Sequence, residues 1–146
     1  MPQTYTTVKA NASLHEITEV WIGDMVLSLM DEAPFIEQWD HLLEICPWAT
    51  LFQSHCYVAT WYRFYAKEYL PIVIKRERGG MLTGLFTLAQ HKSGLITGAG
   101  NRIAEYQCWL TADANDDRFI RDALQEIAKR FPGKRVNLKY LPAGIP

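Results

Sequence analysis

The two neighbouring side chains best suited to acid–base chemistry are those of Glu105 and Tyr106, a carboxylate beside a phenol. Such a pair could hold an amine or hydroxyl group by hydrogen bonds and remove its proton. We expect the pair at the start of a strand over residues 105–111. The alternative is a carboxylate on an edge strand beside a packed tyrosine, and the sequence leaves both interpretations open.

Two other segments have features that bind anions in proteins. Residues 98–102 have the sequence Gly-Ala-Gly-Asn-Arg, whose amides and cation could cradle an anion, although an ordinary turn also explains them. Residues 111–119 precede a predicted helix, and a helix N-terminus can hold a phosphate. This segment has no glycine and carries Asp113, Asp116 and Asp117, which would repel phosphate and would cap the helix well. We therefore assign no cofactor-binding residues.

The histidines and cysteines do not form the pattern of a metal site. The four histidines lack the i, i+4 pairing of a helical site, so we predict no metal ion: His15, His41, His55 and His91. His55 is adjacent to Cys56, but adjacent helical residues point in different directions, which argues against a catalytic pair. The three cysteines, Cys46, Cys56 and Cys108, lack the spacing of a zinc site or disulfide framework, which predicts reduced thiols in a cytoplasm.

Length and composition predict one ordered domain over residues 1–146. We expect residues 1–14 to be loosely ordered and residues 142–146 to be a linker or a truncated end. A formal charge of −1 predicts no general attraction to nucleic acids or anionic membranes. The start of the chain does not resemble a signal peptide, and no apolar run approaches the ~20 residues that span a bilayer. We therefore expect a soluble cytoplasmic protein.

The hydrophobic pattern predicts an α/β fold of the α+β type. It indicates strands over 15–22, 72–74, 81–89, 105–111 and 136–140, and helices over 34–46, 54–69 and 119–131. Residues 25–30 either extend the first strand or form a turn of helix, and residues 94–100 form a loop with a short extended piece. The predicted order is β-α-α-β-β-β-α-β, with three helices on one curved, mixed, mainly antiparallel sheet. Basic residues near the hairpin turn, Lys75, Arg76 and Arg78, are interpreted as its solvated end.

This order of elements is similar to the first part of the GNAT acyltransferase architecture. Short motifs add to the similarity: Phe-Gln-Ser at 52–54, Trp61 on the next helix, Gly-Leu-Phe-Thr-Leu-Ala at 84–89, Gly-Ala-Gly at 98–100, and Glu-Tyr at 105–106. Over residues 35–141 the chain resembles the N-terminal half of CelD-like acyltransferases, relatives of the Fem-type aminoacyl transferases. It departs from that family at Thr87, where proline is usual, and at Glu105, where aspartate is usual.

The resemblance implies acyl transfer from acetyl-CoA or another acyl-CoA to an amine or hydroxyl acceptor, with the cofactor commonly held by the C-terminal copy in tandem proteins. It implies Glu105 and Tyr106 as catalytic residues and Gln53, Trp61 and Trp109 as substrate-binding residues. Tryptophans can stack on a sugar or an adenine, and core packing is the alternative. The expected partners are a small-molecule acceptor, a second GNAT-like domain or a second copy of the chain. The alternative is a non-catalytic module that binds a protein or small ligand through its aromatic surface or an open sheet edge.

Overall fold

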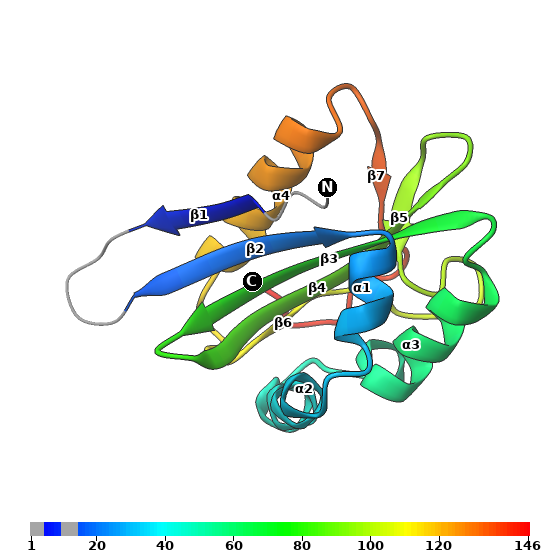
Figure 1. Cartoon of the computed structure of the whole chain (residues 1–146). Helices are drawn as coiled ribbons and strands as arrows, with labels where there is room; N and C mark the ends of the chain where they lie inside the picture. The colour runs from blue at the N-terminus through cyan, green and yellow to red at the C-terminus, as the bar shows by residue number, and fades with distance from the viewer. Residues whose placement is uncertain (1–4, 10–14) are drawn as a thin grey trace.

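The computed structural model describes residues 5–9, as backbone, and residues 15–146. These residues form an α+β fold with one open sheet, four α-helices and a short 3₁₀ helix (Figure 1). The elements are β1 (Tyr5–Lys9), β2 (Glu16–Ile22), α1 (Asp24–Leu29), α2 (Ala33–Ile45), η1 (Leu51–Gln53), α3 (His55–Phe64), β3 (Tyr69–Arg78), β4 (Met81–His91), β5 (Ile96–Gly98), β6 (Leu110–Thr111), α4 (Arg118–Arg130) and β7 (Val136–Asn137). None of the helices in the described residues is long and apolar enough to cross a bilayer.

The sheet is mixed and mostly antiparallel. Its order is β1-β2-β3-β4-β5-β7, and β6 pairs with β4 beside β5. The long strands β3 and β4 form a hairpin around Gly79 and Gly80, whose φ angles of 57° and 78° match a tight two-residue turn. β7 runs parallel to β5, because the chain crosses over through α4 between them.

Helices cover both faces of the sheet, because side chains alternate along each strand. Lys75 on β3 lies over the ring of Phe35 in α2, whereas its neighbour Arg76 lies over the ring of Phe119 in α4. Thus α2 packs on one face and α4 on the opposite face (Figure 1). Helix α4 approaches β4 at Gly84, where a Cβ atom would lie 2.7 Å from the Phe119 ring. A glycine is required there for α4 to pack this closely.

The structure confirms that the three predicted helices and the hairpin exist, and it corrects the bounds of several elements. The helix predicted over 54–69 ends at Phe64, and Tyr69 already belongs to β3. Residues 24–29 form an additional helix, α1, so there are four α-helices rather than three. Residues 5–9 form an unpredicted strand, whereas the rest of the segment 1–14 lies outside the described residues. The strand predicted over 105–111 is limited to Leu110–Thr111, and the last strand to Val136–Asn137. Between 105 and 109 the backbone bonds mainly to side chains: Gln53 donates to the Tyr106 carbonyl, and the Trp48 indole donates to the Trp109 carbonyl.

The basic residues near the hairpin turn are mostly not solvated. Lys75 and Arg76 are 7% and 4% exposed, which contradicts the solvated interpretation for both. Arg76 forms an ion pair with Asp116, and Lys75 forms ion pairs with Glu19 at 3.0 Å and Glu77 at 2.5 Å. The hairpin end therefore carries cations that are buried together with their own acids.

Candidate functional site

The predicted pair Glu105–Tyr106 lies in the loop before β6, not at a strand start. The Glu105 side chain is exposed, and Tyr106 is 37% exposed. Gln53 is 4% exposed and lies next to this loop. Its Oε1 accepts hydrogen bonds from the amide and hydroxyl of Thr50, at 2.9 and 2.8 Å, and its Nε2 donates to the Tyr106 carbonyl at 3.0 Å. Gln53 therefore fixes the loop position, and its amide is already engaged within the protein.

The two predicted tryptophans differ in their surroundings. Trp109 is 5% exposed and packs edge-on against Phe86 with ring centroids 5.9 Å apart, in the core. Its indole Nε1 is buried without a hydrogen-bond partner among the described residues. Trp61 is equally buried, but it forms part of the wall of a cavity of about 610 Å³. We call this cavity the aromatic pocket.

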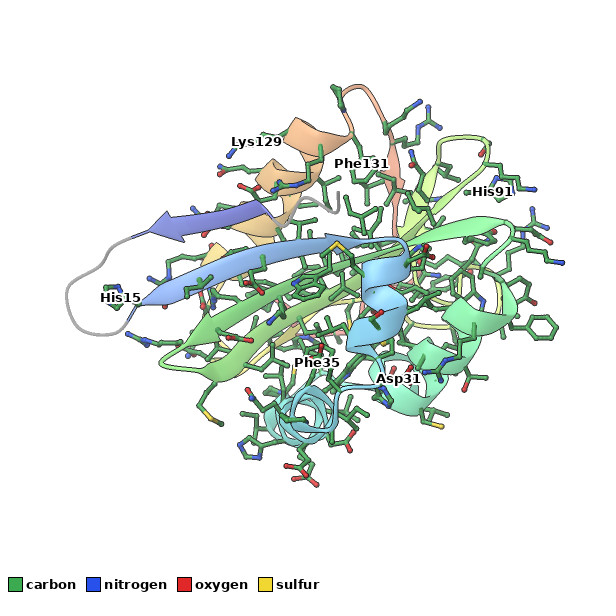
Figure 2. All side chains as sticks on the ribbon, viewed as in Figure 1. His15, Asp31, Phe35, His91, Lys129 and Phe131 are labelled. Atoms are coloured by element: carbon green, nitrogen blue, oxygen red, sulfur yellow. The ribbon has the colours of Figure 1, made fainter. Side chains whose placement is uncertain are left out.

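The aromatic pocket lies at the end of the sheet where His91 is labelled, far from His15 (Figure 2). Its walls come from the end of α3, the β4–β5 turn, the loop 100–107 and the segment that follows β7. Four rings form a continuous cluster on one side: the Trp61 centroid lies 5.2 Å from Tyr65 and 4.9 Å from Tyr69, and Tyr69 lies 5.0 Å from His91. Aromatic faces of this kind can stack on a ring-shaped or apolar ligand.

The loop 98–107 forms the opposite wall and is held from within. Gly100 and Asn101 have φ angles of 96° and 41°, which turn the chain sharply. The amides of Gly98, Ala99, Asn101 and Ile103 all donate to acceptors of the protein itself. These four amides do not converge on an open site, which favours the interpretation of the loop as an ordinary turn. The Asn101 side chain reaches across the pocket and donates to the Tyr69 hydroxyl.

Gln107 connects this loop to the ends of β5 and β7. Its Oε1 accepts from the amide of Gly98 at 3.2 Å and from the amide of Lys139 at 3.1 Å. Its Nε2 donates to the Asn101 carbonyl at 2.6 Å, and its backbone amide donates to the Lys139 carbonyl at 3.0 Å. One buried glutamine thus holds three segments of the pocket wall together. No motif in the sequence indicated this residue.

Two cations line the aromatic pocket, Arg102 and Lys139. Both are exposed, and neither forms an ion pair with an acid among residues 15–146. The Lys139 Nζ lies 5.7 Å from the ring centre of Tyr140. Glu68 is the acidic residue of the wall, so the charged side chains leave one positive charge in excess. The pocket wall therefore combines stacking surfaces with uncommitted positive charge.

An apolar groove of about 430 Å³ adjoins the aromatic pocket along α3. Trp61, Tyr65 and Ile103 line both hollows. Leu51 and Phe64 form the outer part of the groove, and their side chains are 70% and 79% exposed. Tyr57 lies in its base with a buried hydroxyl that has no partner among the described residues, and burial raises the pKa of that hydroxyl.

The N-terminus of α4, where a helix can receive a phosphate, is already occupied by a carboxylate. Asp116 Oδ1 accepts a hydrogen bond of 2.9 Å from the Arg118 amide, while its other oxygen pairs with buried Arg76. Burial alone would raise the pKa of Asp116, but the hydrogen bonds from Arg76 and Arg118 outweigh it and hold the pKa below its usual range. Asp116, interpreted from the sequence as part of a cap, is thus both a cap and the partner of a buried cation.

No group of three or more metal-ligating side chains within the described residues is arranged to hold an ion. No family model, no curated protein and no solved structure matches this chain.

Proposed function

We propose that this chain is the acceptor-binding half of a CelD-like acyltransferase of the GNAT superfamily. In this proposal the aromatic pocket binds a small amine or hydroxyl acceptor, and a second GNAT-like domain supplies the acyl-CoA. The observation that carries the proposal is the pocket itself. It combines four clustered rings with two cations that have no acid partner among residues 15–146, in a cavity of about 610 Å³. Cavities of this size with a few convergent polar groups are typical of small-molecule sites.

The arrangement of elements supports the family part of the proposal. A strand, a set of helices and a run of antiparallel strands are followed by one helix and a last strand, β7. The crossover through α4 makes β5 and β7 a parallel pair, next to antiparallel neighbours. Relative to the predicted β-α-α-β-β-β-α-β order, the chain has two additional strands, β1 and β5, and an additional helix, α1. Fold alone does not define a function, so the site must carry the argument.

The acyl-CoA part of the reaction does not fit the α4 N-terminus of this chain. A pyrophosphate there would meet the carboxylate of Asp116, which already uses the Arg118 amide and neutralises Arg76. Two further acids, Asp113 and Asp117, lie in the same turn. Placing a second anion beside these carboxylates is electrostatically unfavourable. We therefore derive no catalytic step through acyl-CoA in this domain.

The residues of the pocket suggest how an acceptor would be held. Trp61, Tyr65 and Tyr69 offer ring faces, while Arg102 and Lys139 offer charge-assisted hydrogen bonds. Glu105 and Tyr106 do not line the pocket, although they lie on the same loop as Ile103. They would touch the reacting group of the acceptor only if it projects from the pocket towards that loop, where the second domain would have to bring the acyl group.

Calorimetry tests the proposal with two sets of ligands. We expect no heat of binding with acetyl-CoA up to millimolar concentration, and binding by at least one member of a panel of amino sugars, sugar acids and amino acids. Tyr65→Ala should weaken that binding, whereas Leu124→Ala, a change on α4 across the sheet, should not. Micromolar binding of acetyl-CoA to this chain, or binding by no member of the panel, would overturn the proposal.

A second candidate function is a non-catalytic interaction module. It is favoured by the large exposed side chains of Leu51, Phe64 and Ile103, which line one groove. Contiguous exposed apolar surface often marks a protein interface. Sedimentation velocity distinguishes this candidate: self-association that Phe64→Ala abolishes would favour the module, and a monomer at all concentrations would count against a homodimer.

A further inference from the structure

The aromatic pocket and the apolar groove lie next to each other. Three side chains, Trp61, Tyr65 and Ile103, belong to the walls of both hollows. Helix α3 lines the groove and ends at the pocket, so the two hollows lie along the same helix. A molecule that fills only the pocket would leave the groove exposed to water.

The two parts of this site differ in chemistry. The pocket carries Arg102 and Lys139, opposed by the carboxylate of Glu68. The groove is lined almost entirely by carbon, with Leu51 and Phe64 at 70% and 79% exposure. Exposed side chains of this size are unfavourable in water, and burying them against an apolar group is favourable in proportion to the area covered.

We infer that the ligand of this site is an amphipathic anion: a small molecule with a carboxylate or phosphate head, the amine or hydroxyl group that accepts the acyl group, and an unbranched apolar chain. The head would lie in the aromatic pocket near Arg102 and Lys139, and the chain would lie in the apolar groove against Phe64. This inference rests on the proposed function, because it names the chemical class of the acceptor. It rests on two observations, the excess positive charge of the pocket and the shared walls that join it to the groove.

Alkyl phosphates of increasing length test this inference by calorimetry on the intact chain. The probes are inorganic phosphate, butyl, hexyl and octyl phosphate, and hexanol as the neutral counterpart. Burial of one methylene is worth about 0.8 kcal/mol, so affinity should rise about fourfold for each added methylene until the chain outgrows the groove. Hexanol and inorganic phosphate should both bind at least tenfold more weakly than hexyl phosphate. Equal affinity along the series would overturn the inference.

Two variants separate the contributions of head and chain. Phe64→Ala should flatten the dependence on chain length, and Arg102→Gln should weaken hexyl phosphate by at least tenfold while leaving hexanol unchanged. The matched controls on the other face of the sheet are Leu124→Ala and Arg121→Gln, which should change neither value. A loss of similar size in the controls would contradict the assignment of the site.

The same experiment distinguishes the inferred ligand from other occupants of the groove, and it distinguishes failure of this inference from failure of the proposed function. Binding to vesicles of anionic phospholipid, with none to monomeric alkyl phosphates, would replace the inference with a membrane surface. Self-association that buries Phe64 and blocks hexyl phosphate would assign the groove to a second copy of the chain. If polar acceptors bind in the pocket but alkyl phosphates gain nothing from their chains, the inference fails and the proposed function stands.

Discussion

The hairpin of β3 and β4 has two ends, and both carry a pair of cations. At the turn end lie Lys75 and Arg76, which are 7% and 4% exposed and paired with acids. At the other end, where Tyr69 pairs with His91, lie Arg102 and Lys139, which are exposed and have no acid partner among residues 15–146. Both ends carry two positive charges, but the pair at the turn end is buried with acids and the pair at the pocket end is exposed.

The comparison distinguishes cations that stabilise the fold from cations that remain exposed to solvent. A buried cation must carry its counterion with it, because desolvation without a partner costs several kcal/mol. At the turn end, the counterions are Glu19, Glu77 and Asp116. They neutralise both buried cations, so neither cation is left to bind a ligand. At the pocket end, the cations are exposed to solvent and share the pocket wall with aromatic rings. Substitutions at each end of the hairpin test this contrast.

Removing the acid at the turn end should destabilise the protein strongly. Asp116→Ala leaves Arg76 buried without its partner, and we expect a loss of about 3–5 kcal/mol in the free energy of unfolding, measured in urea. The control is its neighbour Asp117→Ala, which breaks an exposed pair with Arg121 and should cost at most about 1 kcal/mol. Similar losses from the two changes would mean that the buried pair has no special role.

The same pair should make stability depend on pH. Asp116 has a folded pKa below its usual range. Its contribution is therefore complete above the unfolded pKa of about 3.9 and is lost as the pH falls through the lower folded pKa. Urea unfolding of the wild type and Asp116→Asn should differ most near neutral pH and converge in strong acid. A gap that stays constant down to acid pH would contradict this assignment.

At the pocket end, the largest structural effect should come from Gln107. Gln107→Ala removes three side-chain hydrogen bonds and leaves the buried amide of Gly98 without an acceptor. We expect a loss of about 1–3 kcal/mol in the free energy of unfolding and weaker binding of any pocket ligand. Gln90→Ala, which removes one contact to Gly94 in the β4–β5 turn, serves as the control and should leave binding unchanged.

The smallest effect on stability should come from the groove. Phe64 is 79% exposed, so Phe64→Ala should change the free energy of unfolding by no more than about 0.5 kcal/mol. Phe119 is the matched buried residue at 0% exposure, and Phe119→Ala should cost about 3–5 kcal/mol. Thermal unfolding of the two variants side by side measures the contrast. A large loss from Phe64→Ala would mean that this side chain supports the fold, which would remove it from the ligand site.

The elements that the sequence predicted well are those whose pattern is local. The helices over 33–45, 55–64 and 118–130 and the β3–β4 hairpin follow from apolar periodicity, a proline start, a serine cap and a Gly-Gly turn. Residues 105–109 were predicted as strand but form a loop, because their backbone bonds to side chains such as Gln53 and Trp48 instead of a neighbouring strand. The aromatic residues of this stretch, Tyr106 and Trp109, are of a type that favours strands.

The buried ion pair and the aromatic pocket both depend on contacts that have no local signature. Arg76 and Asp116 are separated by 40 positions, so neither sequence neighbourhood reveals that the other will neutralise it. Trp61 was expected to bind a ligand and does line the pocket, whereas Trp109, expected for the same reason, lies in the core. Both are tryptophans near apolar neighbours in the sequence, and only the three-dimensional arrangement of α3 and β6 distinguishes them.

The parallel pairing of β5 with β7 sets the moment at which the pocket can first exist. Lys139 reaches the wall only after Ile96 has paired with Val136, a contact between segments far apart in the chain. Such long-range pairings form slowly, because the intervening chain must be ordered before they are made. During synthesis, the earlier strands and α3 emerge first, so the ring cluster precedes the cation that completes it. A nascent chain would therefore complete this pocket wall only after residues 136–139 have emerged.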